Sequence, residues 1–173
     1  VGKFDRDEVL SLLGKGYGGL KASKIERLDH GEEPTQLEHR RLDMELDLQS
    51  EMLQLAYRAP ALTHPDYPAL SVLDGILTVG NSSRLERRLV DSGLATSAGA
   101  WLPAFQEDSL YEFSATMRPG KAADAAIAVI RAELADLRDN LVTTEELERV
   151  RNQLLVMLHS GLLSHSGRAG FIG

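Results

Sequence analysis

The clearest hydrophobic pattern in the chain is a strict alternation that begins at Leu42. Apolar side chains occupy every second position through Leu48, and acidic side chains occupy the positions between them. This period of two is typical of a strand with one buried face and one solvated face. Further extended segments are predicted at residues 53–60, 94–102 and 110–117. In the last of these, one face is predicted to carry Tyr111, Phe113, Ala115 and Met117.

Apolar residues at helical spacing predict the remaining elements. Asp5 can cap a first helix with Glu8 as its capping-box partner, and Thr143 with Glu146 can cap a later one in the same way. The expected buried stripes of the longer helices are formed by Leu70, Leu73, Ile76 and Leu77, by Ile127, Ile130, Leu134 and Leu137, and by Leu147, Val150, Leu154 and Leu158. Four strands without regular strand-helix alternation predict an α+β fold, in which an antiparallel sheet has helices packed on one face.

The stretch from Gly80 to Thr96 predicts a helix-loop-helix-strand corner in few residues. Gly80 can end one helix in a left-handed conformation, and Ser83 can cap the next with Glu86 as its partner. Gly93 is expected to stop that second helix at positive φ, after which the chain becomes extended.

Two blocks within this corner, Ser83-Arg84-Leu85 and Gly93-Leu94-Ala95, carry a family resemblance. Together with Arg58-Ala59-Pro60 upstream, they resemble the second domain of the insulinase-like and mitochondrial-processing-peptidase-like zinc metallopeptidases. The start of the chain, with Val1-Gly2-Lys3-Phe4-Asp5 and Tyr17-Gly18-Gly19-Leu20, resembles the last strand and helix of that family's preceding domain.

The resemblance implies a division of the chain. Residues 1–20 correspond to the end of the preceding, zinc-type domain. Residues 21–41 are polar, lack a sustained period and contain Gly31 and Pro34, so they are predicted to be a linker. Residues 42–173 correspond to the second peptidase-like domain. That domain normally continues with further sheet and helix, so its C-terminal end is expected to be incomplete here.

Composition excludes several functional classes. The chain has 173 residues, 43% of them apolar, and a formal net charge of −7. This acidic balance argues against a nucleic-acid partner, because phosphate binding requires clustered Lys and Arg. No apolar run approaches the ~20 residues needed to span a bilayer, so no membrane insertion is expected. The absence of cysteine excludes disulfides and thiolate metal sites but leaves the compartment open, periplasm or cytoplasm if the source is bacterial.

The histidines do not form the zinc motif of the family. That motif is His-x-x-Glu-His on a helix, in which two histidines bind zinc and the glutamate serves as general base. No such spacing occurs among His30, His39, His64, His159 and His165. The resemblance places the motif in the preceding domain, so zinc is expected in the parent protein and no metal is expected in this piece.

The family's second domain can still assist catalysis through an arginine and a tyrosine that hold the substrate carbonyl. Here Thr96 stands at the tyrosine position, and the arginine position falls on Leu89 or Val90. Neither role carries over, and no catalytic residue is assigned. Arg87 and Arg88 lie within one turn of that position and could reach a substrate, or replace the missing arginine, or form a basic surface.

Two further features have both a structural and a functional interpretation. Arg84 could face a substrate chamber or pair with an acid near the helix start. Trp101 and Phe105 could line the chamber or pack in a core or interdomain contact. The candidate substrate-facing residues are therefore Arg84, Arg87, Arg88 and Thr96.

Two classes of function follow from the resemblance. In the first, the parent is a zinc-dependent endopeptidase acting on peptides or unfolded polypeptides, and this piece walls the chamber. Its partners would be the missing zinc-binding domain and a second homologous subunit, because in some bacterial relatives the zinc motif and the arginine-tyrosine pair lie on two chains. The alternative is a catalytically silent homologue that serves as a scaffold or partner subunit.

Overall fold

The chain forms two compact units in a computed structural model that describes residues 1–26, 31 and 34–173. One unit is Asp47–Leu162, and the other comprises Val1–Leu46 and Leu163–Gly173. His30 and part of the predicted linker at 21–41 lie outside the described residues. The domain limits expected at residues 20/21 and 41/42 stay predictions.

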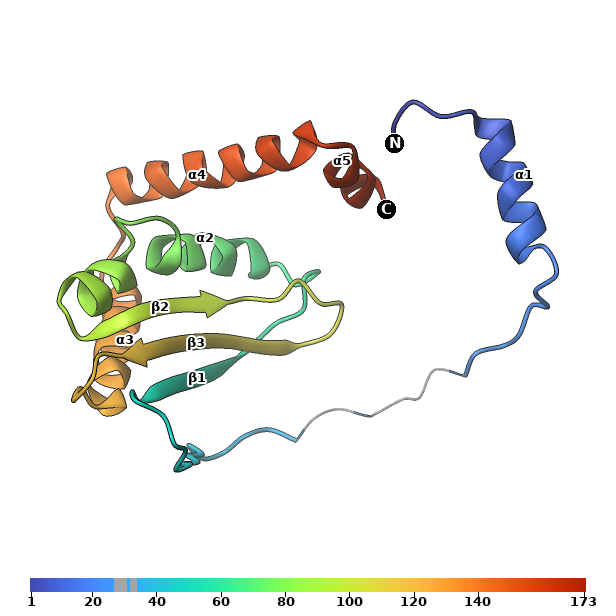
Figure 1. The fold of residues 1–173 in the computed structure, drawn as a ribbon. Helices are drawn as coiled ribbons and strands as arrows, with labels where there is room; N and C mark the ends of the chain where they lie inside the picture. The colour runs from blue at the N-terminus through green and yellow to red at the C-terminus, as the bar shows by residue number, and fades with distance from the viewer. Residues whose placement is uncertain (27–30, 32–33) are drawn as a thin grey trace. The chain divides into compact units, whose positions relative to one another are not determined.

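The larger unit is built on a three-stranded antiparallel sheet (Figure 1). Its strands are β1 (Met52–Ala59), β2 (Ala95–Trp101) and β3 (Ser109–Met117). They lie in the order β1-β3-β2, so β3 is central and the other two are edges. The α+β class and three of the four strands expected from the sequence are confirmed.

The fourth expected strand, at residues 42–48, is not formed. No described segment pairs with these residues, and the four apolar side chains of their alternation are 56–82% exposed. An alternating sequence supplies a face for burial, but a strand also needs a neighbour that accepts its backbone hydrogen bonds. Among the described residues that neighbour is missing, which explains the difference from the prediction.

One face of the sheet is covered by helices. These are α2 (Tyr67–Thr78), the short π-helix η1 (Glu86–Asp91) and α3 (Ala123–Asp139). The side chains of Tyr111, Phe113, Ala115 and Met117 point to this layer and are at most 5% exposed, as their shared face predicts. They form one core with Leu77, Leu85, Leu89, Ala126 and Ile130.

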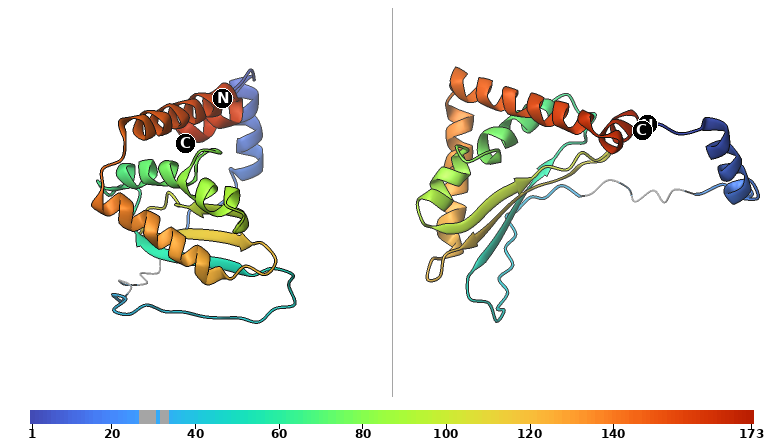
Figure 2. Two further views of the ribbon diagram at one scale, coloured as in Figure 1. Left: turned by 90° about the vertical axis from the view of Figure 1, so that its left-hand side faces the viewer. Right: turned by 45° about the horizontal axis from the view of Figure 1, so that its top comes forward.

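Helix α4 (Thr144–Leu163) runs beside α2 (Figure 1, Figure 2). The two helices approach closely where Val150 meets Gly75, since a Cβ on Gly75 would collide with Val150 Cγ1. Val150 is fully buried, but Leu147 and Leu158 are each 45% exposed. The stripe predicted for this helix is therefore covered only in part.

The opposite face of the sheet has no helix over it among the described elements of this unit. Gln54 Nε2 donates a 2.6 Å hydrogen bond to Glu112 Oε2 across β1 and β3. At the end of β2, the rings of Trp101 and Phe105 meet edge to face with centroids 6.0 Å apart. Both side chains are more than half exposed, so they belong to a surface and not to the core.

The smaller unit contains α1 (Arg6–Tyr17) and α5 (His165–Ile172). Asp5 caps α1 as predicted, because its carboxylate accepts from the backbone N–H groups of Asp7 and Glu8 at 2.9 Å. Helix α5 was not predicted; Ser164 starts it by accepting from the N–H of Gly167 at 2.9 Å. No helix in the described part of the chain is long and apolar enough to cross a membrane.

Candidate functional site

The corner between α2 and β2 begins with a glycine turn. Gly80 has φ +82°, as its predicted left-handed conformation requires, and its carbonyl accepts from the N–H of Ser83 at 3.0 Å. The predicted Ser83–Glu86 capping box is wrong. Ser83 Oγ is buried and has no hydrogen-bond partner among the described residues. The turn points this hydroxyl into the packed interior, so it cannot cap the orphan N–H groups of the helix.

The corner ends at Gly93, which has φ +76° and follows Ser92, the C-cap of η1. The positive φ predicted for this residue is confirmed. The N–H of Leu94 donates to the carbonyl of Leu89 at 3.0 Å, a spacing of five residues that matches the wider π-helical turn. This bond and the positive φ of Gly93 turn the chain from η1 into β2 without a longer loop.

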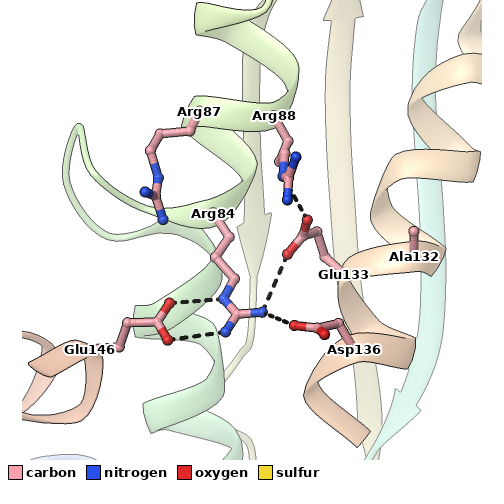
Figure 3. A pocket seen from close by; sticks show the side chains of 7 residues that line it. All are labelled: Arg84, Arg87, Arg88, Ala132, Glu133, Asp136 and Glu146. Atoms are coloured by element: carbon pink, nitrogen blue, oxygen red, sulfur yellow. Dashed lines mark hydrogen bonds and ion pairs between the residues drawn. The ribbon is translucent and has the colours of Figure 1, made fainter. Parts of the chain in front are cut away.

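Arg84 is the centre of the polar side chains in this corner (Figure 3). Its guanidinium donates to both carboxylate oxygens of Glu146, from Nε at 2.9 Å and from Nη2 at 3.1 Å. Nη1 donates to Asp136 Oδ2 at 2.6 Å and lies 3.4 Å from Glu133 Oε2. The side chain of Arg84 is 13% exposed. This arrangement matches its structural interpretation, except that the acids come from α3 and α4 and not from its own helix.

The charges in this network shift one another's pKa values. The hydrogen bonds from Arg84 hold the pKa of the Glu146 carboxyl below its ordinary value, against the opposing effect of burial. Hydrogen bonds from Arg84 and then Asn140 lower the pKa of Asp136. Bonding to Glu146 raises the pKa of Arg84 itself. All three shifts favour the ionised forms, so the network is charged at neutral pH.

A pocket of ≈ 660 Å³ lies beside this network, lined by Arg84, Arg87, Arg88, Ala132, Glu133, Asp136 and Glu146 (Figure 3). Arg88 pairs with Glu133 at 3.0 Å but is 69% exposed. Arg87 lines the pocket and is exposed. The lining carries three arginines and three carboxylates. It therefore has no net charge with which to attract an ionic ligand.

Thr96, the fourth candidate residue, does not line this pocket. It lies on β2 at an irregularity between Ala95 and Ser97, where the register against β3 shifts. Its hydroxyl donates to the carbonyl of Thr116 at 3.2 Å. The structure thus brings three of the four candidates together and leaves Thr96 on the sheet.

The described residues do not offer a site for zinc. Nowhere in the described ranges do three or more His, Asp or Glu side chains gather so that they could hold a metal ion. The three carboxylates around Arg84, those of Glu133, Asp136 and Glu146, are all engaged by its guanidinium. The donor set required for a catalytic zinc therefore does not fit the part of the chain that the structure describes.

Sequence reasoning missed the acids that surround Arg84. Glu133 is 8% exposed and lies on α3, directly before Leu134 of the apolar stripe. A carboxylate on a buried stripe needs a cation, because an unpaired buried charge is costly. The position of Glu133 on the apolar stripe was therefore the sequence signal that could have predicted a buried ion pair. Glu146 was recognised only as a capping residue, and the Thr143–Glu146 box is present, with a 3.1 Å bond from the Glu146 N–H to Thr143 Oγ1.

Comparison with known proteins gives a consistent result. Residues 1–154 match the family model described as the peptidase M16 inactive domain. The chain is 31% identical over 174 aligned residues to the zinc protease PqqE of Helicobacter pylori, an alignment that covers 98% of this chain and 39% of that protein.

Solved structures agree with this match. A protease from Helicobacter pylori superposes with a TM-score of 0.79 at 30% identity, over 99% of this chain and 43% of that chain. An inactive peptidase domain from Bordetella parapertussis superposes with a TM-score of 0.60 at 27% identity, over 68% of this chain and 63% of its own. The chain thus spans less than half of the length of the two Helicobacter proteins.

Proposed function

Because this chain belongs to the M16 peptidase family and matches its inactive domain, we propose that it walls the substrate chamber of a zinc-dependent peptidase. The substrates would be peptides or unfolded polypeptides. In this proposal residues 1–20 end the preceding zinc-type domain, 21–41 connect the two domains, and 42–173 form most of the second domain. The zinc and its ligands belong to the preceding domain, and a second homologous subunit completes the enclosure.

The observation that carries this proposal is the uncovered face of the sheet. One face is sealed by α2, η1 and α3, whereas the other exposes small and polar side chains with aromatic residues at one end. Gly99, in the second half of β2, has no atom within 4 Å of the position that a Cβ would occupy. A broad open sheet surface of this kind suits an extended chain better than a compact small ligand.

The role of the Arg84 pocket in this proposal is structural. The guanidinium of Arg84 is hydrogen-bonded to three carboxylates. In this proposal it therefore holds α3 and α4 against the corner and does not bind substrate. Arg87 and Arg88 stay candidates for substrate contact because their side chains are exposed. Thr96 lies on the edge strand, and because its hydroxyl already donates to Thr116, it can accept one hydrogen bond from a passing chain.

The second candidate function is a catalytically silent partner or scaffold subunit. Thr96 favours it, because it occupies the position at which the family's catalytic tyrosine would stand. A threonine hydroxyl is too short to replace the phenol in reaching a substrate carbonyl. In this case another chain would carry the catalytic residues, and the present chain would supply only part of the chamber wall.

The test compares the full-length protein, the same protein lacking residues 42–173, and this 173-residue chain. We expect the full-length protein to bind stoichiometric zinc and cleave an unfolded casein substrate. The deletion should keep zinc and lose turnover, and the chain alone should bind no stoichiometric zinc. A full-length protein without zinc and without turnover would instead support the silent subunit. Stoichiometric zinc on the chain alone would contradict the assignment of zinc to the preceding domain.

A further inference from the structure

The Arg84 pocket keeps open hydrogen-bonding positions after its internal ion pairs are formed. Its volume of ≈ 660 Å³ lies within the range of small-molecule sites (Figure 3). Among the described residues that line it, six are charged and only Ala132 is apolar. Charged walls do not suit an apolar ligand, because their groups would lose hydration without gaining a partner. The pocket therefore suits a ligand that itself carries charge.

Two arginines of η1 form the cationic side of the pocket. The side chain of Arg87 is exposed and forms no hydrogen bond or ion pair with a described residue. Arg88 approaches Glu133 through Nε at 3.0 Å, and its terminal nitrogens form no hydrogen bond within the described ranges. Planar guanidinium groups with open donors bind carboxylates through two parallel N–H···O bonds. The η1 side can therefore hold a carboxylate.

Two carboxylates of α3 form the anionic side. Glu133 is 8% exposed, and its oxygens lie 3.0 Å from Arg88 and 3.4 Å from Arg84. Asp136 accepts from Arg84 at 2.6 Å and from Asn140 at 2.8 Å, with one bond to each oxygen. A carboxylate offers about four acceptor positions, so each of these two groups can accept a further donor. The α3 side can therefore hold an ammonium group.

The balance of charge decides which ligand fits. The lining has three arginines and three carboxylates. A simple anion is attracted by the arginines but repelled by the carboxylates, and a simple cation meets the reverse. A ligand that carries both charges gains at both sides. These gains are larger than in open water, because the side chains of Arg84 and Glu133 are only 13% and 10% exposed.

We propose that the Arg84 pocket binds a small zwitterion, that is, an amino acid or a short peptide with both termini free. The carboxylate of the ligand lies against Arg87 and Arg88, and its ammonium lies against Glu133 and Asp136. The bonds from Arg84 hold α3 and the start of α4 in place, so the site is formed before the ligand arrives. The inference concerns the helix layer and does not depend on the proposed function.

The test titrates alanine and trialanine separately into the 173-residue chain and follows arginine Nε–H and backbone amide signals by NMR. We expect saturable shifts of the Arg87 and Arg88 signals and of the amides of residues 132–136. The dissociation constant of one of the two ligands should be about 1 mM or tighter. The ligand that binds more tightly distinguishes a free amino acid from a peptide as the source of the zwitterion.

Blocking each end of the tighter ligand separates the two sides of the site. Acetylation of its amino group removes the cation, and amidation of its carboxyl group removes the anion. Each change should weaken binding about tenfold or more, because one side of the pocket loses its charged partner. These comparisons leave the protein unchanged, so they test the α3 side without a variant that disturbs the ion pairs of Arg84.

Arg87→Gln tests the η1 side in the protein. Its side chain has no partner among the described residues, so the fold should persist, which circular dichroism can check. The variant should bind the tighter ligand about threefold to tenfold more weakly and should bind the amidated ligand as wild type does. Arg151→Gln, the same change on an exposed part of α4 outside the pocket, should alter neither affinity.

The inference is overturned if the signals of the pocket residues do not saturate with either ligand, or if both blocked ligands bind as tightly as the parent. It is also overturned if Arg87→Gln binds as tightly as Arg151→Gln, or if the shifts lie on the sheet strands and not on η1 and α3. Zinc content and turnover of the full-length protein do not depend on these titrations, so the two proposals can fail separately.

Discussion

Replacing Arg84 with alanine should markedly destabilise the larger unit. The change removes the only described cation that contacts Glu146 and Asp136, and it leaves Glu133 with Arg88 alone. The arginine also ties three elements together, since it lies in the corner before η1 and its acids lie on α3 and at the start of α4. Loss of Arg84 therefore uncouples these helices as well as removing a charge.

The magnitude follows from burial. The side chains of Arg84, Glu133 and Glu146 are 13%, 10% and 17% exposed. Breaking a fully buried pair costs about 3–5 kcal/mol, whereas an exposed pair contributes at most about 1 kcal/mol. We therefore expect Arg84→Ala to lower the free energy of unfolding by about 2–3 kcal/mol at pH 7. The matched control is Arg88→Ala, which removes one pair from a 69% exposed side chain and should cost about 1 kcal/mol or less.

Urea denaturation followed by the fluorescence of Trp101 measures this difference, because that residue lies in the larger unit. With urea slopes of about 1–3 kcal/mol per molar, the expected midpoint shift is about 0.7–3 M. The baseline structure of the variant can be checked by circular dichroism before denaturant is added. An Arg84→Ala variant as stable as Arg88→Ala would refute the reasoning.

The pH dependence gives a second check on the same variant. The folded-state pKa of Glu146 is lowered below its ordinary value of 4.5, chiefly by the hydrogen bonds from Arg84. The stability this contributes is present above that value and is lost as the pH falls through the folded pKa. The difference in the free energy of unfolding between wild type and Arg84→Ala should therefore become smaller as the pH is lowered from 7. A gap that stays constant down to acid unfolding would show that charge pairing is not its source.

Further substitutions test three separate features. Gly93→Ala should cost about 1 kcal/mol from backbone strain alone, because φ is +76° and no atom lies within 4 Å of the added Cβ; Gly93→Val should cost at least as much, and an unchanged melting temperature would contradict the turn. Tyr111→Phe removes the 2.9 Å bond to Asp74 and should cost about 1–2 kcal/mol at pH 7 in urea melts. Burial raises the pKa of Asp74, so its protonation favours the folded state, and this loss should diminish as the pH is lowered. Gly75→Ala should cost about 1–3 kcal/mol by overpacking against Val150, and combining it with Val150→Ala should cost less than the two changes added together.

A strand could be predicted from the sequence where its alternating pattern matches the face that the fold buries. The apolar face of residues 110–117 has only one way to be buried, and β3 buries it as predicted. Gly80 and Gly93 were predictable because a left-handed turn has few sequence solutions. These are local requirements, which a single sequence states directly.

The candidate site was less predictable because its partners come from distant segments. Arg84 contacts acids 49, 52 and 62 positions away along the chain, and no local pattern specifies those distances. Ser83 shows the converse problem, since its capping signal is local but packing buries the hydroxyl. The alternation at residues 42–48 likewise states which side chains share a face and says nothing about which strand lies beside them.

That alternating segment has a consequence for handling the protein. Residues 42–48 expose Leu42, Met44, Leu46 and Leu48 on one side, with no strand beside them among the described residues. Segments of this type nucleate intermolecular cross-β stacking unless charges interrupt it. Asp43, Glu45 and Asp47 are the interrupting charges, and each is exposed. These three carboxylates therefore oppose intermolecular strand pairing by this segment, and we expect that neutralising them would lower the solubility of the isolated chain.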